Sequence, residues 1–450
     1  MSESPPLCVE DCELALLTDL YQLTMLQAYW KEQMTGRATF SLFFRKMPAT
    51  RRFMLACGQQ HAAAQICRIR FTPAMLQRLA ATARFDHAFL DWLAEWRFSG
   101  DIWTLPEGTP VFPNEPLLEV DAPIAEAQLV ESLLMNLVQL ETVLASKAVR
   151  IVMAARGRPV VDFGMRRMHG IDAAVRGVRA YRTAGLAGTS NVLGGLRHDL
   201  PLSGTMAHSY VLAHDSETEA FRAFAHHYPG TTLLVDTHDT LDGVRQVIEL
   251  LRNEPQLRVD AIRLDSGDLG ELARRSRALL DEAGHGRIRI IASSGLDEHR
   301  IAALIEEKAP IDAFGVGTQM SVSADAPVID LSYKLVEYAG TPRVKHSTGK
   351  VNLPGRKQLF RRQDEHGRYS GDVLAQRDEN LPDAEPLLVP LVRDGRVDEG
   401  HLADAGRARE RVPSVLARLP DRLRCLEPRQ DGLDDFPVAL SRALRRLAAT

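Results

Sequence analysis

Two aspartates three residues apart follow a predicted buried strand and form a dense group of reactive side chains. The segment Asp265-Ser-Gly-Asp268 comes directly after the apolar run at 260–264, and Arg263 lies two residues before it. Two carboxylates, a hydroxyl and exposed backbone amides can hold ribose hydroxyls or a hydrated Mg²⁺ on a pyrophosphate. The same pattern also suits an Asx turn that caps the following helix. Spacing alone favours neither interpretation.

Two short turns later in the chain have the composition of anion-binding loops. Ser293-Ser-Gly295 and Gly315-Val-Gly-Thr318 each follow a short apolar run. Glycine lets the backbone approach an anion, and successive N–H groups can cradle a phosphate. Most such turns only connect elements, so each is a weak signal. Two of them at neighbouring strand ends favour a phosphate site, which barrel enzymes often place late in the chain.

A histidine and an arginine pair stand at two further predicted strand ends. His208, within Gly204-Thr-Met-Ala-His-Ser209, could be a general base or a nucleophile toward a phosphoryl group. An isolated histidine is more often structural. Arg166 and Arg167 follow Phe163-Gly164, where a guanidinium could grip a carboxylate and the aromatic ring could stack on a flat ligand. The alternative for this pair is an exposed helix start.

A metal site is a further hypothesis for the segment Asp236-Thr-His-Asp239. Its two carboxylates and its imidazole, from His238, are common metal ligands, but their spacing matches no known ligand pattern. The hypothesis therefore rests on residue types alone.

The elements that must position these residues alternate between short apolar runs and helical patterns. Alternating strands and helices predict a parallel sheet, and barrel enzymes place their chemistry at the C-terminal ends of its strands. We therefore predict an irregular α/β barrel with all these motifs at one mouth. An open doubly wound sheet gathers its sites at the same strand ends and stays an alternative. The six predicted strands are 159–163, 200–203, 232–235, 260–264, 288–292 and 311–314.

Two other regions flank the predicted barrel. We predict an N-terminal α+β domain over residues 1–130, the barrel over 131–350, and a C-terminal segment over 351–450 that packs on the N-terminal domain. Within the barrel, Asp297 is a predicted helix N-cap. The other expected elements are helices at 14–30, 125–153, 402–419 and 437–447, a strand at 39–44, and surface strands and loops over 362–400.

The composition describes a globular chain of 450 residues, 45% of them hydrophobic and 25% charged. With 55 basic and 59 acidic residues, the net charge of -4 gives no support for attraction to nucleic acid or membranes. Five cysteines without a CxxC pair predict neither a disulfide framework nor a thiolate zinc site. The N-terminus lacks the pattern of a signal peptide, and no apolar stretch reaches the length of a membrane helix. We expect a cytoplasmic enzyme.

Several strings of the chain, in order, resemble the nicotinate phosphoribosyltransferase family. The opening Leu17-Thr-Asp-Leu-Tyr-Gln-Leu-Thr-Met25 is similar to the family's N-terminal signature. The similarity runs from about residue 14 to 361, with a weaker echo at 436–441. The other strings that carry it are 43–48, 53–58, 162–170, 188–193, 204–209, 263–268, 315–318 and 353–357.

The resemblance implies a barrel like that of type II phosphoribosyltransferases and a reaction in NAD biosynthesis. The nitrogen of nicotinate would attack C1 of phosphoribosyl pyrophosphate while Mg²⁺-pyrophosphate leaves, giving nicotinate mononucleotide by salvage. By the same resemblance, nicotinate contacts Tyr21, Phe163, Arg166, Thr205 and Arg263, with Tyr21 reaching across the interface of a homodimer that shares its active sites. Asp265 and Asp268 serve the ribose and Mg²⁺-pyrophosphate, and the other phosphoribosyl contacts are Ser266, Gly267, Ser294, Gly295, Gly315, Gly317 and Thr318.

His208 matches the family's phosphorylated histidine, so the resemblance implies ATP as a co-substrate and a ligase that is also a phosphoprotein. Three alternatives stay open. A nicotinamide phosphoribosyltransferase would want an acceptor for a neutral amide, whereas the arginines at 166 and 167 favour an acid. A non-catalytic sensor of phosphoribosyl ligands would not need His208, Arg263, Asp265 and Asp268. A sugar-phosphate aldolase or isomerase would want a lysine or carboxylate base at the barrel mouth, and no predicted strand end presents a lysine.

Overall fold

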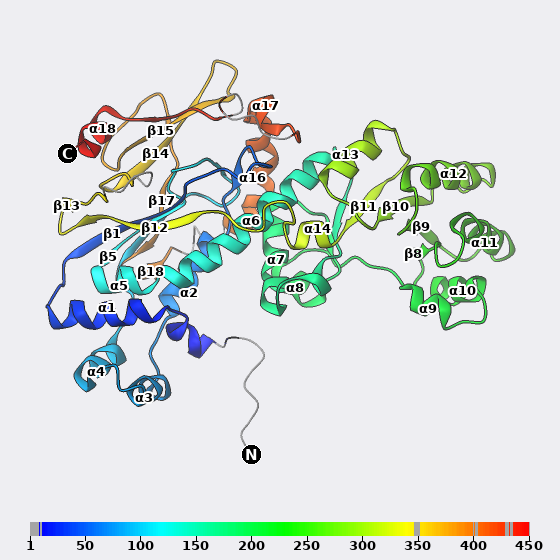
Figure 1. Ribbon diagram of the computed structural model, residues 1–450. Helices are drawn as coiled ribbons and strands as arrows, with labels where there is room; N and C mark the ends of the chain where they lie inside the picture. The colour runs from blue at the N-terminus through cyan, green and yellow to red at the C-terminus, as the bar shows by residue number, and fades with distance from the viewer. Residues whose placement is uncertain are drawn as a thin grey trace. The chain divides into compact units, whose positions relative to one another are not determined.

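The chain folds into two compact units, shown in the computed structural model of Figure 1. The first combines residues of Met1–Ser146 and Ala326–Thr450, and the second is Lys147–Asp325. The structure describes residues 9, 11–345, 352–398, 400, 404–427, 432 and 435–449. Among these residues every helix is too short or too polar to cross a lipid bilayer.

The first unit is built on a seven-stranded antiparallel sheet. Its strands, in spatial order, are β13 (Thr341–Pro342), β12 (Leu331–Tyr338), β1 (Arg37–Phe44), β5 (Leu118–Pro123), β3 (Asp101–Thr104), β17 (Val389–Arg393) and β18 (Arg396–Val397). Strand β1 is central because seven of its eight residues are buried, which confirms the strand predicted at 39–44. Strands β2 (Met54–Leu55) and β4 (Pro110–Val111) form a separate pair.

Helices surround this sheet and connect it to the second unit. Helix α5 packs on β1 and β5, and α1 packs on α5. The helix predicted at 14–30 is divided at Asp19 into a 3₁₀ turn and α1, and the one predicted at 125–153 is divided at Val130 into α5 and α6. The helices up to this point are η1 (Asp11–Leu16), α1 (Leu20–Lys31), α2 (Gln59–Arg68), α3 (Pro73–Ala81), α4 (His87–Glu95), α5 (Ile124–Leu129) and α6 (Glu131–Ala154).

A second, four-stranded sheet corrects two expectations about the C-terminal region. Residues 438–440, expected to be helical, form β19 (Val438–Leu440), because they pair in parallel with β15 (Tyr369–Gln376). The strand β15 is largely buried rather than superficial, since Val373 and Ala375 pack with Phe360 in one apolar cluster. The remaining elements here are β14 (Lys357–Gln363), β16 (Glu385–Pro386), α16 (Asp404–Arg418), α17 (Asp421–Arg424) and α18 (Arg442–Ala448).

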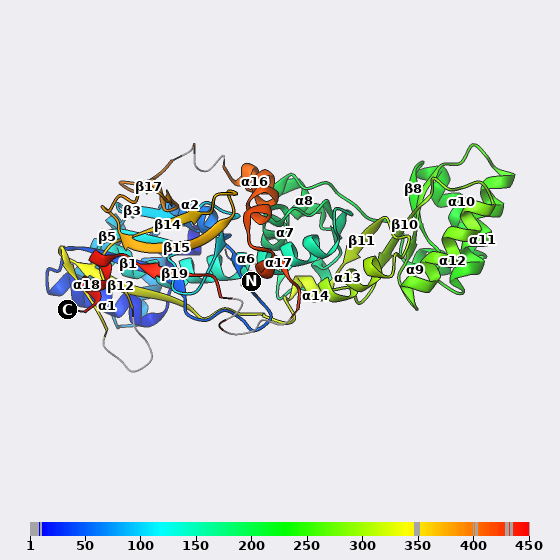
Figure 2. The ribbon, with the colours of Figure 1, turned by 90° about the horizontal axis from the view of Figure 1, so that it is seen from above.

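The second unit contains a curled sheet of six parallel strands, of which β8, β10 and β11 are labelled in Figure 2. In spatial order they are β7 (Gly188–Thr189), β6 (Val160–Asp162), β11 (Ala313–Val316), β10 (Arg289–Ser293), β9 (Val259–Leu264) and β8 (Thr231–Leu234). This order is that of a barrel left open between β7 and β8, without the reversal that marks a doubly wound sheet. The predicted irregular α/β barrel is therefore confirmed, and the doubly wound alternative is wrong.

The ring is completed irregularly between β7 and β8. Residues 200–203, predicted as a strand, contribute only an isolated bridge from Leu202 to Thr189. Pro201 has no N–H to donate to a ladder, which explains why a regular strand does not form here. Beyond this bridge, the hydroxyl of Thr205 donates to the carbonyl of Thr232 in β8, so a side chain joins the two edges.

Helices follow most of the strands and cover the outside of the curled sheet. Helix α12 packs against β9 and β10, and α10 packs against β8. The predicted N-cap Asp297 is confirmed, because its side chain accepts from the amide of Arg300 at 2.8 Å. The helices of this unit are η2 (Met165–Arg167), α7 (Ile171–Ala184), α8 (Val192–His198), α9 (His208–Leu212), α10 (Glu217–His227), α11 (Thr240–Asn253), α12 (Leu269–Glu282), α13 (Glu298–Glu306) and α14 (Thr318–Ser321).

Candidate functional site

The carboxylate of Asp265 is held by side chains from two neighbouring strands. Arg263 Nη2 donates to Asp265 Oδ1 at 2.8 Å, and Ser293 Oγ donates to the same oxygen at 2.6 Å. Arg263 Nε also donates to Ser293 Oγ at 2.8 Å. Burial raises the pKa of Asp265, but the hydrogen bond from Ser293 and the charges of Arg263 and His208 outweigh it and bring the pKa below its usual value. The group is therefore an anion at neutral pH.

The side chain of Asp236 supports the turn that contains Asp265. Its Oδ2 accepts from the backbone amide of Asp265 at 2.8 Å and from Ser266 Oγ at 2.6 Å. Asp239, which follows, caps α11 by accepting from the amides of Leu241 and Asp242. Within the described residues no three histidine, cysteine or acidic side chains converge as metal ligands. The hypothesis of a metal site from Asp236, His238 and Asp239 is therefore wrong, because two of its members serve local structure.

His208 begins α9 and faces the same carboxylate. Its Nε2 lies 3.8 Å from Asp265 Oδ2, and its Nδ1 lies 3.1 Å from Thr237 Oγ1. The side chain is 42% exposed, so a ligand can reach the ring. The structure therefore brings His208, Arg263 and Asp265 together, as their predicted positions at strand ends required.

The ring of Phe163 packs closely against Gly315, where a side chain would collide with it. A Cβ atom on Gly315 would stand 2.3 Å from Phe163 Cε2, which is closer than real Cβ atoms approach. The guanidinium carbon of Arg263 lies 5.0 Å from the centroid of the same ring. Side chains from the ends of β6, β9 and β11 thus form one surface with an aromatic face and a cation, a combination that suits a flat anion.

The two arginines of η2 have different surroundings. Arg167 Nη1 donates to Thr318 Oγ1 at 2.8 Å and so joins η2 to the turn after β11. Arg166 is exposed. Arg167 is exposed as well, so the interpretation as an exposed pair at a helix start stays compatible with the structure, although Arg167 also has the contact to Thr318.

One of the two predicted phosphate turns contains residues in the left-handed conformation that favours glycine. Ser294 and Gly295 there have φ values of 82° and 62°, and Gly267, in the turn after β9, has a φ of 76°. Left-handed residues in a turn can direct successive amides toward an anion. Gly317 is the N-cap of α14, and Ser294 and Gly295 are both exposed.

Asp268 adopts the capping arrangement that spacing alone left open. Its Oδ1 accepts from the amides of Gly270 at 3.1 Å and Glu271 at 3.2 Å. The side chain is nevertheless 69% exposed. The cap uses one carboxylate oxygen, so the capping role and a role toward a ligand are compatible.

Tyr21 belongs to the first unit, near the start of α1, and is 47% exposed. Burial of its hydroxyl, followed by the negative charge of Glu131, raises its pKa, so the phenol stays protonated. A large apolar side chain at this exposure is available to a ligand or a second subunit.

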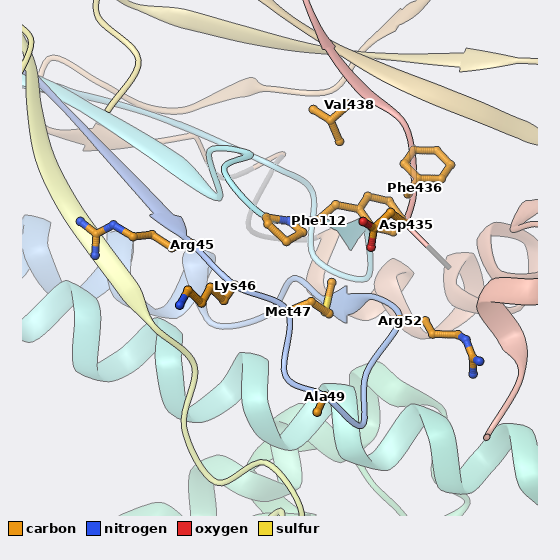
Figure 3. Close-up of a pocket in the computed structure, with 10 residues that line it drawn as sticks. Arg45, Lys46, Met47, Ala49, Arg52, Phe112, Asp435, Phe436 and Val438 are labelled. Atoms are coloured by element: carbon orange, nitrogen blue, oxygen red, sulfur yellow. The ribbon is translucent and has the colours of Figure 1, made fainter. Parts of the chain in front are cut away.

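The first unit also has a cavity of about 650 Å³, shown in Figure 3. Two of its cations have internal partners. Arg52 Nη1 donates to the carbonyls of Cys425 and Glu427, and Arg45 lies 3.5 Å from Asp330. These contacts hold the chain together, so the cavity is structural in our interpretation. The lining residues are Arg45, Lys46, Met47, Ala49, Arg52, Phe112, Pro113, Asp435, Phe436 and Val438.

Sequence reasoning missed three residues that complete the arrangement. The sequence indicates Ser293 only as part of a turn and Asp236 only as a candidate metal ligand, and it gives no separate signal for Thr237. Each stands at or within three residues of a strand's C-terminal end. A search for polar residues at every such position would have found all three.

A curled parallel sheet with a cation, an aromatic ring, a histidine and a carboxylate at its strand ends defines an α/β-barrel enzyme. Residues 16–139 match the model of the nicotinate phosphoribosyltransferase N-terminal domain, and residues 159–349 match that of the nicotinate phosphoribosyltransferase family. The chain belongs to the nicotinate phosphoribosyltransferase family, which confirms the resemblance.

Individual relatives agree with this membership. The chain is 52% identical over 428 residues to the nicotinate phosphoribosyltransferase pncB2 of Mycobacterium tuberculosis, covering 95% of this chain and 91% of that protein. The nicotinate phosphoribosyltransferase of Bacillus subtilis is 37% identical over 388 residues, covering 84% and 79%. The crystal structure of human nicotinic acid phosphoribosyltransferase superposes with a TM-score of 0.84 at 27% identity, covering 96% of this chain and 99% of the human chain.

Proposed function

We propose that this protein transfers the phosphoribosyl group of phosphoribosyl pyrophosphate to nicotinate, with Mg²⁺ and with coupled hydrolysis of ATP through a phosphohistidine at His208. The product, nicotinate mononucleotide, would serve cytoplasmic NAD salvage. Family membership supports the substrates, and the cluster of Arg263, Asp265 and His208 at the barrel mouth is the observation that supports the mechanism.

The surface formed by Phe163 and Arg263 is the proposed seat of nicotinate. The ring of Phe163 would stack on the pyridine, with Tyr21 from a partner subunit of a homodimer on its opposite face. The cations of Arg263 and Arg166, with Thr205, would bind the carboxylate. Fixed in this way, the pyridine nitrogen attacks C1 of the ribose as the C1–O bond to pyrophosphate breaks. Holding both reactants in line removes much of the entropic barrier.

The proposed phosphoribosyl site uses the turns after β9, β10 and β11. Amides of Ser294, Gly295, Gly317 and Thr318, beside Gly315, would hold the 5′-phosphate. The left-handed conformations of Ser294 and Gly295 support this role, because such residues can direct successive amides toward an anion. Ser266, Gly267 and Asp265 would contact the ribose. The anionic state of Asp265 suits this role, because a carboxylate accepts from ribose hydroxyls and offsets positive charge that develops on the sugar.

The residues present fit Mg²⁺ that arrives with pyrophosphate. Mg²⁺ usually keeps several waters and binds one or two protein carboxylates together with substrate phosphates. Asp265 and the exposed carboxylate of Asp268 are suitable donors for such an ion. When bound, the ion would neutralise charge on the leaving pyrophosphate.

Energy coupling would proceed through the ring of His208. One ring nitrogen attacks the γ-phosphorus of ATP, so an N–P bond forms as the bond to ADP breaks. Water later hydrolyses the N–P bond and releases phosphate. Asp265 faces Nε2 and would stabilise a proton on that nitrogen while the ring carries the phosphoryl group.

Product formation from phosphoribosyl pyrophosphate and Mg²⁺ tests the proposal, offering nicotinate or nicotinamide, each with and without ATP. We expect nicotinate mononucleotide to form faster with ATP and to be accompanied by ADP. His208→Ala should lose the gain from ATP and keep some uncoupled transfer. Full activity of this variant with ATP contradicts the phosphohistidine. Preference for nicotinamide contradicts the substrate, and ligand binding without product favours a sensor.

The matched pair Arg166→Ala and Arg167→Ala tests recognition of the acid. Arg166→Ala should raise the KM for nicotinate far more than the KM for phosphoribosyl pyrophosphate. Arg167→Ala should instead affect phosphoribosyl pyrophosphate, because Arg167 holds Thr318. Equal effects of Arg166→Ala on both KM values mean that this residue does not read the carboxylate.

A further inference from the structure

Four residues of the second unit, including His208, are linked in a closed cycle of contacts. Asp236 accepts from the amide of Asp265, Asp265 faces His208 Nε2, His208 Nδ1 lies within hydrogen-bond distance of Thr237 Oγ1, and Thr237 is bonded to Asp236 through the backbone. Both ring nitrogens therefore have a partner. One partner lies after β9 and the other lies after β8.

We propose that Asp236 and Thr237 are positioning residues that fix His208 against Asp265 and so make phosphoryl transfer through the histidine efficient. This inference rests on the proposed function. In it, Thr237 acts on the orientation of the His208 ring, and Asp236 acts through Asp265 and Ser266.

The segment after β8 is suited to this task because its adjacent residues Asp236 and Thr237 bind different elements. Asp236 is directed to the turn after β9, where its Oδ2 binds both the amide of Asp265 and the hydroxyl of Ser266. Thr237 is directed to the start of α9. A single strand end thus determines the separation of the histidine and the carboxylate.

The two partners contact the ring at different distances. Thr237 Oγ1 lies 3.1 Å from Nδ1 and can donate or accept a hydrogen bond, so it can hold the ring in either tautomer. Asp265 Oδ2 lies 3.8 Å from Nε2, which is an ion-pair distance and too long for a hydrogen bond. Thr237 is therefore the partner whose hydrogen bond fixes the orientation of the ring.

The competing interpretation is that Asp236 and Thr237 only stabilise the fold. Asp236 is 7% exposed, and a buried carboxylate that satisfies a turn needs no other purpose. The two interpretations differ for Thr237, since its loss affects the ring of His208 without removing a buried charge. Thr237 is therefore the residue to test, with Asp236 as a second case.

The experiment compares Thr237→Val, Thr237→Ser and Thr231→Val in the full-length protein. Valine keeps the shape of threonine and removes the hydroxyl, serine keeps the hydroxyl, and Thr231 is a control at the other end of β8. For each variant, nicotinate mononucleotide formation is measured with and without ATP. ¹⁵N-histidine NMR spectra of the resting protein report the Nδ1 signal of His208, assigned by its loss in His208→Ala.

We expect Thr237→Val to lower the ATP-coupled rate by about tenfold or more, because small displacements of a reacting group can cost about a hundredfold. The uncoupled rate should fall less, and the Nδ1 signal should shift. Thr237→Ser should restore both, and Thr231→Val should resemble the wild type. Asp236→Asn should lower coupled and uncoupled transfer together, because Asp265 also serves the ribose.

Two results would overturn the proposal. One is an equal fall of coupled and uncoupled rates in Thr237→Val. The other is an unchanged Nδ1 signal in that variant. Absence of phosphohistidine in the wild type would instead contradict the proposed function, and the NMR comparison would still decide whether Thr237 orients the ring.

Discussion

The guanidinium of Arg263 lies 5.0 Å from the centroid of the Phe163 ring and is fixed from behind by Asp265 and Ser293. Two hydrogen bonds hold the cation in this position. The ring, in turn, depends on the space above Gly315. A flat surface beside a fixed positive charge complements an aromatic carboxylate, and each component of this arrangement can be removed separately.

Removing the ring while keeping an apolar residue tests the flat surface. Phe163→Leu should raise the KM for nicotinate by roughly 2- to 13-fold, which corresponds to the loss of about 0.5–1.5 kcal/mol of aromatic stacking. The KM for phosphoribosyl pyrophosphate should change less. Phe224→Leu, in the aromatic group of α10, is a matched control. Steady-state kinetics that show equal rises in both KM values would refute the assignment.

Adding one methyl group at position 315 tests how the ring is held. In Gly315→Ala the new Cβ would stand 2.3 Å from Phe163 Cε2, so the ring must move away from its place beside Arg263. We expect kcat/KM for nicotinate to fall by about tenfold or more, while the protein stays folded. Gly286→Ala, where the Cβ meets only the Asp281 side chain, should leave kinetics unchanged. Normal kinetics in Gly315→Ala would mean that the ring position is unimportant.

Local patterns predicted the barrel because its strands and helices alternate along the chain. The exceptions have identifiable causes. Pro201 prevents a regular strand, a local effect that the sequence shows directly. The strand Val438–Leu440 could not be predicted, because its partner β15 lies more than sixty residues away and pairing overrides local preference.

The candidate site was predictable to the level of which strand ends meet. Arg263, Asp265 and His208 follow different strands, and a closed parallel sheet brings such residues together. The sequence could not show that Asp236 binds the turn of Asp265 or that Thr237 faces His208. These contacts depend on the direction of side chains at the irregular ends of strands, which no periodic pattern records.

Asp268 allows the capping role and the proposed ligand role to be separated. Asparagine caps helices as well as aspartate does, whereas alanine does not. Asp268→Asn should therefore keep the free energy of unfolding and, if the carboxylate serves Mg²⁺-pyrophosphate, raise the Mg²⁺ concentration needed for half-maximal activity. Asp268→Ala should also lose about 0.5–2 kcal/mol of stability. Denaturant unfolding with Mg²⁺ titration measures both. Wild-type activity in Asp268→Asn, at every Mg²⁺ concentration, would mean that Asp268 serves only as the helix cap.

A buried carboxyl in the first unit should make stability depend on pH. Glu115 is fully buried, and its Oε2 accepts from the amide of Phe112 at 2.8 Å. Burial, and then the charge of Asp372, raise its pKa well above the usual value, although Arg361 opposes them. The native state therefore favours the protonated form.

This raised pKa predicts that stability is lost on the alkaline side. Below the unfolded pKa of about 4.3 both states are protonated, so Glu115 has no pH-dependent effect. As the pH rises toward the folded pKa, the unfolded state loses its proton first, and stability falls by about 1.4 kcal/mol per pH unit from this group. Glu115→Gln, which mimics the protonated form, should lack this loss and become relatively more stable between pH 5 and about neutral pH. Glu365→Gln, whose side chain is 87% exposed in the wild type, is the control. If urea unfolding gives parallel pH profiles for the wild type and Glu115→Gln, the carboxyl of Glu115 is not held protonated by the fold.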